Sequence, residues 1–467
     1  MNLLDTPGHK DFSEDTYRVL TAVDAVVMVI DAGKGIEPQT RKLFEICRRR
    51  GVPIFTFMNK MDRPARDPLE LLHELEQMLG LHTHAMNWPL GNGPDFRGVF
   101  DRRAQELYLF EPTSGGAYRA PVAVASMSDP QLRQSVSSHS IETAAEELAL
   151  LDEAAASFDA AAVLRGELTP VFFGSASNNF GVQLLLDTFL EYAPAPRTRN
   201  ALCGPIEPDD RAFSGFVFKL QANMDPKHRD CIAFIRVCSG RFERSMTVLH
   251  QQSGGKVRLS SSHKLFARER ETVDVAFAGD VIGIVGHPEF RVGDTLTDDS
   301  RILYREIPRF APECFAYLHG TVGTQHKRFS RGLTQLLQEG VVQSLRVEAS
   351  TQSAPLLGAV GPLQFDVVQY RLETEYGAAS RLEPASWERM RWIAPSTSVD
   401  TLRKATLPSR AALAVDSAGQ QVILFASEWD MQYFVSKNPS LALADTPFSD
   451  DPSATSVVAG DSKLATK

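Results

Sequence analysis

The stretch A-V-V-M-V-I-D at residues 25–31 decides how the first part of the chain folds. A continuous apolar run rich in β-branched side chains, ended by a carboxylate, is typical of a strand buried on both faces of a parallel sheet. The same pattern returns as P-I-F-T-F-M-N at residues 53–59 and as P-V-F-F-G at residues 170–174. Helical patterns lie between these runs, at residues 38–50 and 67–80, so the sequence predicts an α/β domain.

The second of these helices carries clear boundary signals. Asp67 is a good capping residue, Pro68 suits the first turn, and Gly80 suits the end of a helix. Its periodicity predicts a buried stripe formed by Leu71, Leu72, Leu75, Met78 and Leu79.

The rest of the chain divides into further regions. The first domain is predicted over residues 1–197, with an insertion at about 81–169 where the strand–helix rhythm is lost. Short alternating strands at residues 205–307 predict a small antiparallel β-barrel. Residues 308–444 mix strands and helices and predict an α+β domain, and the polar residues 445–467 predict a disordered tail.

Composition excludes several classes of protein. The 49 basic and 58 acidic residues give a net charge of −9, so contact with nucleic acid would depend on local basic patches. Five cysteines, an odd number without a C-x-x-C pair, favour a reducing cytoplasm. No signal peptide is recognisable, and no apolar run approaches the ~20 residues that span a bilayer. We therefore expect a cytoplasmic protein without a membrane partner.

The loop D-T-P-G-H at residues 5–9 follows a short apolar run at residues 2–4, which we interpret as a strand. A carboxylate at a strand end can hold Mg²⁺ through water, and a glycine lets a backbone N–H approach a phosphate. A neighbouring polar side chain can orient attacking water. The same residue types also favour an ordinary turn, so this loop alone leaves both interpretations open.

Two further loops follow strand-like runs, N-K-M-D at residues 59–62 and G-S-A-S at residues 174–177. An aspartate can accept hydrogen bonds from N1–H and N2–H₂ of guanine, whereas adenine lacks that donor pair. Asn59 can bridge the loops, the Lys60 stem can cover the base, and backbone N–H groups of the last loop can bond O6. The alternative for each is an ordinary polar loop. In combination, the three loops favour a nucleotide site at the carboxyl edge of the sheet.

The motifs in combination resemble those of the translational GTPases. Beyond the three loops, the resemblance is carried by the run from Asp24 to Thr40. Three later stretches resemble the bacterial class II peptide chain release factors (release factor three): G-F-V-F-K at 215–219, N-M-D-P-K-H-R-D at 223–230 and G-A-V-G-P-L-Q-F-D-V-V at 358–368.

This resemblance implies a P-loop-GTPase-like α/β domain, then the barrel, then the α+β domain. It also implies GTP and GDP with Mg²⁺ as ligands. The implied partners are the ribosome, through its RNA and proteins, and class I release factors, which such factors drive off the ribosome after peptide release; no DNA partner is implied.

The resemblance assigns roles to the three loops. Asp5 would hold Mg²⁺ through water, and Gly8 would sense the γ-phosphate. Thr6 and Pro7 belong to the same nucleotide-binding loop. The catalytic residue His9 would position the hydrolytic water. The residues that would form the guanine pocket are Asn59, Lys60, Asp62, Ser175 and Ala176.

The sequence departs from the family in the loop that binds the nucleotide phosphates. Gly-Lys occurs only at residues 33–34 and 255–256, and neither fits the phosphate loop G-x-x-x-x-G-K-[ST]. We therefore expect an N-terminally shortened domain that lacks the first strand, the phosphate loop and switch I, and that binds GTP poorly and hydrolyses it slowly. The missing strand would lie between those at residues 2–4 and 25–30.

Two alternatives remain open. An elongation-factor-G-like or ribosome-protection GTPase would carry further domains after the third. A non-catalytic ribosome-binding remnant is favoured by the absent phosphate loop and disfavoured by the intact motifs. In either case, basic residues at 227–229 and 326–328 are candidates for contacts with ribosomal RNA phosphates.

Overall fold

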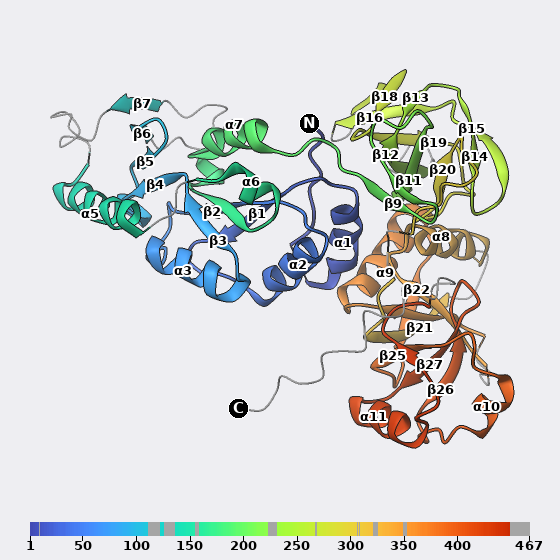
Figure 1. The fold of residues 1–467 in the computed structure, drawn as a ribbon. Coiled ribbons are helices and arrows are strands. Elements are labelled where there is room, and N and C mark those ends of the chain that lie inside the picture. The colour runs from blue at the N-terminus through green and yellow to red at the C-terminus, as the bar shows by residue number, and fades with distance from the viewer. Residues whose placement is uncertain are drawn as a thin grey trace. The chain divides into compact units, whose positions relative to one another are not determined.

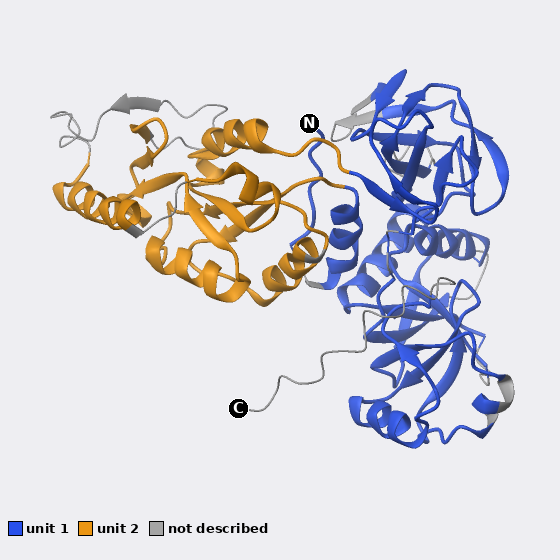
Figure 2. Cartoon of the chain, in the orientation of Figure 1, with its two compact units in different colours: residues 1–22, 198–467 blue, residues 23–197 orange. Residues whose placement is uncertain are grey.

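The computed structural model (Figure 1) describes residues 1–8, 10–110, 122–125, 136–154, 158–222, 231–266, 269–305, 307, 309–320, 326–348 and 353–448. The chain forms two compact units (Figure 2). Unit 1 consists of residues 1–22 and 198–467, and unit 2 consists of residues 23–197. No helix in the described part of the chain has the length and apolar character needed to cross a bilayer.

Unit 2 is built on a parallel sheet, as predicted. Its four strands lie in the order β1 (Val26–Asp31), β2 (Ile54–Asn59), β8 (Leu168–Phe173) and β3 (His82–Ala85). Strands β2 and β8 are buried at almost every position, because their continuous apolar runs are covered on both faces. Strand β1 lies at one end of this sheet, and Val29 in it is 56% exposed.

Two helices of unit 2, α2 (Pro38–Arg49) and α3 (Pro68–Leu79), begin and end close to the predicted residues. The unit also contains α7 (Val182–Tyr192), for which there was no prediction. The Asp67 carboxylate accepts hydrogen bonds from the first turn of α3, and Gly80 ends the helix at φ 62°, where glycine costs little. The predicted stripe is correct except for Met78, which is 38% exposed.

The region interpreted as an insertion differs from the prediction. Strand β3 returns to the parallel sheet beside β8, so this part of the region belongs to the main fold. No apolar run marks this strand, because β3 reads His-Thr-His-Ala. The expected helix is present as α5 (Ser138–Ala154), and α6 (Ala160–Leu164) follows it. An antiparallel sheet comprises β4 (Asn87–Leu90), β5 (Gly98–Asp101), β6 (Glu106–Phe110) and β7 (Val122–Ala125).

The strand predicted at residues 2–4 is wrong. Residues 1–8 form neither helix nor strand, and Leu3 is 81% exposed. A strand needs a neighbour to accept and donate its ladder bonds, and no described strand pairs with this segment. A short 3₁₀ turn, Lys10–Phe12, and helix α1, Ser13–Thr21, come next.

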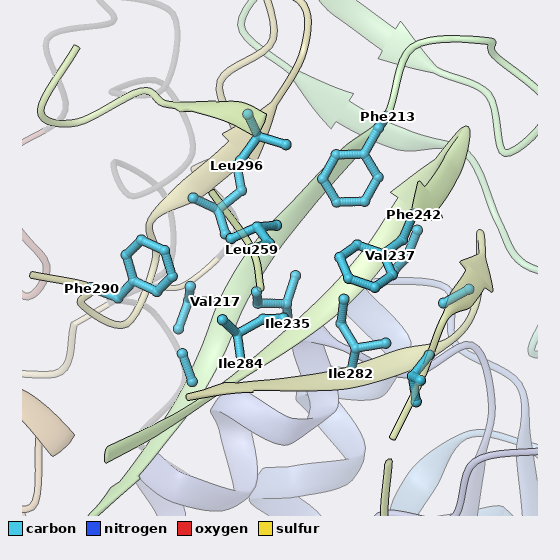
Figure 3. Close-up of a cluster of buried hydrophobic side chains, with 14 of the residues drawn as sticks. Phe213, Val217, Ile235, Val237, Phe242, Leu259, Ile282, Ile284, Phe290 and Leu296 are labelled. Atoms are coloured by element: carbon cyan, nitrogen blue, oxygen red, sulfur yellow. The ribbon is translucent and has the colours of Figure 1, made fainter. Parts of the chain in front are cut away.

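The second region of unit 1 is an eight-stranded antiparallel sheet in the order β15-β14-β20-β11-β12-β19-β16-β17. Figure 3 shows its core, where Phe213, Val217, Ile235, Phe242 and Ile284 gather with other apolar side chains. Its strands and the short ones beside it are β9 (Arg199–Ala201), β10 (Gly204–Ile206), β11 (Ser214–Ala222), β12 (Cys231–Ser239), β13 (Arg241–Glu243), β14 (Thr247–His250), β15 (Gly255–Arg258), β16 (Ser262–Phe266), β17 (Glu269–Thr272), β18 (Val275–Phe277), β19 (Val281–Val285) and β20 (Thr295–Thr297).

The last region of unit 1 is an α+β arrangement with the strand order β24-β21-β23-β22-β26-β27-β25-β28. Its elements are β21 (Cys314–Gly320), α8 (His326–Glu339), β22 (Gln343–Val347), β23 (Leu356–Ala359), α9 (Leu363–Tyr376), β24 (Ser380–Pro384), β25 (Arg389–Ile393), α10 (Val399–Lys404), β26 (Ala412–Val415), β27 (Gln421–Phe425), α11 (Glu428–Lys437) and β28 (Leu443–Ala444).

The predicted tail begins too early. Asp445 pairs with Arg391 at 2.6 Å, and the Phe448 ring packs against the buried cluster around Trp392. Residues 445–448 are therefore attached to the last region, because an ion pair and an aromatic ring hold them. The remainder of the predicted tail lies outside the described residues.

Candidate nucleotide-binding site

Two of the predicted loops meet at the carboxyl ends of β2 and β8. The strands are parallel neighbours, with Met58 opposite Phe173, so both loops leave the same edge of the sheet. The Met61 N–H donates to the Gly174 carbonyl at 3.1 Å. Glycine at position 174 also lets the Phe180 backbone approach closely, because a Cβ there would lie 2.2 Å from the Phe180 carbonyl oxygen.

Asn59 joins the two loops, as predicted. Its Oδ1 accepts hydrogen bonds from the Lys60 N–H at 2.8 Å and from the Ala176 N–H at 2.9 Å. One amide side chain therefore fixes the spacing between residues that are 117 positions apart in the sequence.

Lys60 adopts an uncommon backbone conformation with φ 69°. The left-handed region costs a residue other than glycine roughly 1–2 kcal/mol. The Lys60 Nζ donates to Asp31 Oδ2 at 2.7 Å, and the Gly33 N–H donates to Asp31 Oδ1 at 3.0 Å. The hydrogen bond from Lys60 holds the pKa of Asp31 below its usual value, so this carboxylate stays charged near neutrality.

Sequence reasoning did not place Asp31 in the site. A signal was available, because Asp31 ends β1 as Asn59 ends β2, and the two are opposite each other in the parallel ladder. Parallel strand ends lie side by side, so a carboxylate and a lysine at neighbouring ends are expected to pair.

Asp62 carries the feature that points to a ligand. Its Oδ1 atom is buried, and among the described residues no donor reaches it. A buried carboxylate oxygen without a hydrogen-bond partner lowers the stability of the fold. Such an atom is therefore expected to accept a hydrogen bond from a bound ligand. Guanine offers N1–H and N2–H₂ side by side, which suits a carboxylate. The residues present therefore fit a guanine base.

The loop after β8 is held mainly by its own contacts. Ser175 is fully buried, and its N–H donates to the Phe180 carbonyl at 3.0 Å. The Ser175 hydroxyl accepts from the Asn178 amide at 3.1 Å. Because the N–H groups of Ser175 and Ala176 already donate to protein oxygens, the structure does not leave them free for the predicted bond to guanine O6.

The first predicted loop belongs to unit 1. Asp5, Pro7 and Gly8 are exposed, and Thr6 is half-buried. The Pro7 carbonyl accepts a hydrogen bond from the Thr16 hydroxyl at 3.1 Å, which ties the loop to α1. His9 lies outside the described residues. The roles predicted for this loop stay predictions.

Helix α1, which follows this loop, is anchored in the last region of unit 1. Asp11, 3% exposed, accepts the Leu363 N–H at 2.9 Å and so caps the start of α9, which lacks a side-chain cap from its own Pro362. Arg18 donates to the carbonyls of Glu339 and Gly340, both at 3.2 Å, at the end of α8.

Buried and half-buried charges complete this anchor. Arg18 is paired with Glu14 at 2.7 Å, and both side chains are at most 10% exposed. Asp15 pairs with Lys219 of β11 at 3.2 Å. Helix α1 therefore contacts both other regions of unit 1 through polar groups.

The structure describes only one of the two basic stretches that were predicted to contact RNA. Residues 227–229 lie outside the described residues. The second stretch, His326, Lys327 and Arg328, is exposed in the first turn of α8. Its exposure is compatible with phosphate contacts, and the contacts themselves stay a prediction.

Three family models match consecutive parts of the chain. Residues 1–195 match the elongation factor Tu GTP binding domain, and residues 212–299 match elongation factor G domain 2. Residues 304–435 match the C-terminal domain of the class II release factor RF3.

Curated relatives agree with these models. Peptide chain release factor 3 of Gloeobacter violaceus is 51% identical over 441 residues, which cover 94% of this chain and 83% of that protein. The chain belongs to the peptide chain release factor 3 family. The factor of the same name from Synechocystis sp. is 52% identical over 92% of this chain and 79% of its own length. Release factor 3 is a translational GTPase, so the chain is a GTP-binding translation termination factor by family membership.

A solved structure agrees on the fold. A crystal structure of a Thermus thermophilus protein superposes with a TM-score of 0.64 at 23% identity and covers 88% of this chain. This chain spans 61% of that protein's length. Together with the matched domains, the likeness supports the predicted translational GTPase fold.

Proposed function

We propose that this release factor 3 family member acts in the cytoplasm with GTP to promote dissociation of class I release factors from the ribosome. The proposed domains are residues 1–197, 205–307 and 308–444. The observation that carries guanine specificity is the buried, unpartnered Oδ1 of Asp62 beside the loop joint made by Asn59.

Each predicted residue has a proposed part in binding. Asp62 accepts N1–H and N2–H₂ of guanine, and Asn59 keeps the two loops together. Asp31 holds Lys60, whose aliphatic stem covers the face of the base. Ser175 and Ala176 shape the wall of the pocket.

The phosphate end of the nucleotide is proposed to depend on the first loop. Asp5 holds Mg²⁺ through water, Gly8 meets the γ-phosphate within the loop of Thr6 and Pro7, and His9 orients the water. When bound, Mg²⁺ neutralises charge on the phosphates. The 467 residues contain no G-x-x-x-x-G-K-[ST] run, so we propose weak phosphate binding and slow hydrolysis by this chain.

Guanine recognition is tested by Asp62→Asn. Xanthine carries an oxygen where guanine carries its N2 amino group, and an asparagine amide can donate to that oxygen. In equilibrium binding at millimolar nucleotide, the wild-type chain is expected to prefer GDP over XDP by about 100-fold or more. Asp62→Asn is expected to reverse this order.

The exposed Asp95→Asn is the matched control in the same unit and is expected to leave the preference unchanged. Equal affinity of the wild-type chain for GDP and XDP would contradict guanine recognition by Asp62.

The ribosomal role is tested with termination complexes that carry a labelled class I release factor. Addition of the chain with GTP is expected to speed loss of the label. If the chain binds ribosomes but leaves the rate unchanged, the non-catalytic ribosome-binding alternative replaces this proposal. The elongation-factor-G-like alternative is disfavoured by the match of residues 304–435 to the release factor model.

A further inference from the structure

Helix α11 presents a row of aromatic rings to solvent. Trp429 is 68% exposed, and its ring stacks on Tyr433 with centroids 5.4 Å apart and planes 17° from parallel. Lys437 continues the row, with its Nζ 5.8 Å from the centre of the Tyr433 ring. The three residues are spaced by four, so they occupy one face of the helix.

The opposite face of α11 holds the helix in place. Phe434 is 1% exposed and packs against Phe425 of β27, with centroids 5.6 Å apart. Ser427 caps the first turn through the Asp430 N–H. The exposed row therefore sits on a rigid support, and its rings are ordered before any partner arrives, which lowers the entropy cost of binding.

The charges on α11 are arranged asymmetrically. At its first turn, Glu428 pairs with Arg389 at 3.1 Å and Asp430 accepts from Ser427 at 2.9 Å, so both carboxylates have partners. At its last turn, exposed Lys437 precedes Asn438, which is joined to Thr406 by hydrogen bonds of 2.9 and 3.2 Å. Lys437 therefore places a positive charge at this end of the row.

We propose that Trp429, Tyr433 and Lys437 form a stacking site for an unpaired RNA base. An exposed ring face beside a lysine suits a base with its flanking phosphate, because bases stack on aromatic rings and phosphates attract ammonium groups. This inference rests on the proposed function, since the ribosome supplies the RNA. The alternative is a protein partner that encloses Trp429 in a pocket. The test must distinguish this alternative from RNA binding.

The test measures binding of the full chain to a labelled single-stranded rA₁₀ oligonucleotide by anisotropy at low salt. Trp429→Ala is expected to weaken this binding by about 5- to 160-fold, the range for loss of one stacked base. Trp429→Phe keeps a ring face and is expected to retain most of the affinity. An RNA duplex of equal length is expected to bind Trp429→Ala and the wild-type chain alike, because its bases are already stacked.

Tyr370→Ala is the matched control, since Tyr370 on α9 is 69% exposed and is expected to contribute nothing. Equal binding of rA₁₀ by the wild-type chain and Trp429→Ala would overturn the proposal. A Trp429→Ala defect on ribosomes without one on rA₁₀ would also overturn it, in favour of a protein partner. Failure of guanine recognition is detected separately by the GDP and XDP measurement, which does not involve α11.

Discussion

The guanine-pocket loops and helix α1 fall within the same match to a GTP-binding domain, yet they are held in different ways. The loops at the ends of β2 and β8 are fixed by neighbours in unit 2, chiefly through Asn59. Helix α1 is fixed by α8, α9 and β11 of unit 1. The family match therefore places residues 1–22 in the GTP-binding domain, whereas the packed contacts place the same residues in unit 1.

This difference indicates that the guanine-pocket loops and helix α1 can respond separately to a change in the chain. The guanine pocket depends on hydrogen bonds between loops of one sheet edge, so it is expected to persist whatever happens in unit 1. The loop at residues 5–8 leads into the 3₁₀ turn and α1, in which Asp11 and Arg18, respectively, cap two helices of the last region. A shift of both elements is expected to weaken those caps.

The largest effect is expected for Arg18→Ala, which acts on unit 1. The change leaves the Glu14 carboxylate buried without its partner and removes the donor for two carbonyls at the end of α8. We expect unit 1 to lose about 3–5 kcal/mol of stability, the usual loss when one member of a buried ion pair is removed. Hydrogen exchange of peptides over α8 and α9 should rise, while peptides over β2 should not change.

Arg331→Ala on the exposed face of α8 is the control and should leave exchange unchanged. If β2 peptides exchanged faster together with α8 in Arg18→Ala, the separation of the two regions would be wrong.

A smaller effect is expected for Asn59→Ala, which acts on the loops of unit 2. It removes the acceptor shared by the N–H groups of Lys60 and Ala176, a loss of about 0.5–1.5 kcal/mol. Exchange should rise in the loops after β2 and β8 and stay unchanged in α8 and α9. Affinity for guanine nucleotide should fall with it.

Asn92→Ala provides the matched control, because the Asn92 amide also joins two loop segments through Ala65 but is exposed to solvent. It should cost less than Asn59→Ala. Equal losses in the two variants would show that the partial burial of the Lys60–Asn59 hydrogen bond does not matter.

Local features of unit 2 were predictable because their signals are local. The cap of α3 at Asp67, its end at Gly80 and the bridge made by Asn59 all follow from residue types at fixed spacing. Strand β3 was missed because its side chains are polar or small, and its place is set by pairing with β8. Met78 was misplaced because periodicity gives a face of a helix but not the width of the surface that covers it.

The features that could not be predicted depend on distant parts of the chain. Nothing in the residues around Asp11 and Arg18 indicates that they cap helices more than 300 positions later. Asp31 was missed because its partner is also not local in the sequence, although it is less distant. Lys60 follows the next strand of the sheet.

The capping of α8 by Arg18 has a consequence for how the protein is made. The two contacting residues are separated by 321 positions, so α1 leaves the translating ribosome long before its binding surface exists. At 5–20 residues per second, that delay is roughly 16–64 s. During this interval the Arg18 side chain lacks the carbonyl groups to which it donates, and α1 can make this contact only after α8 has emerged. Docking of α1 thus waits for a segment that is synthesised more than 300 residues later.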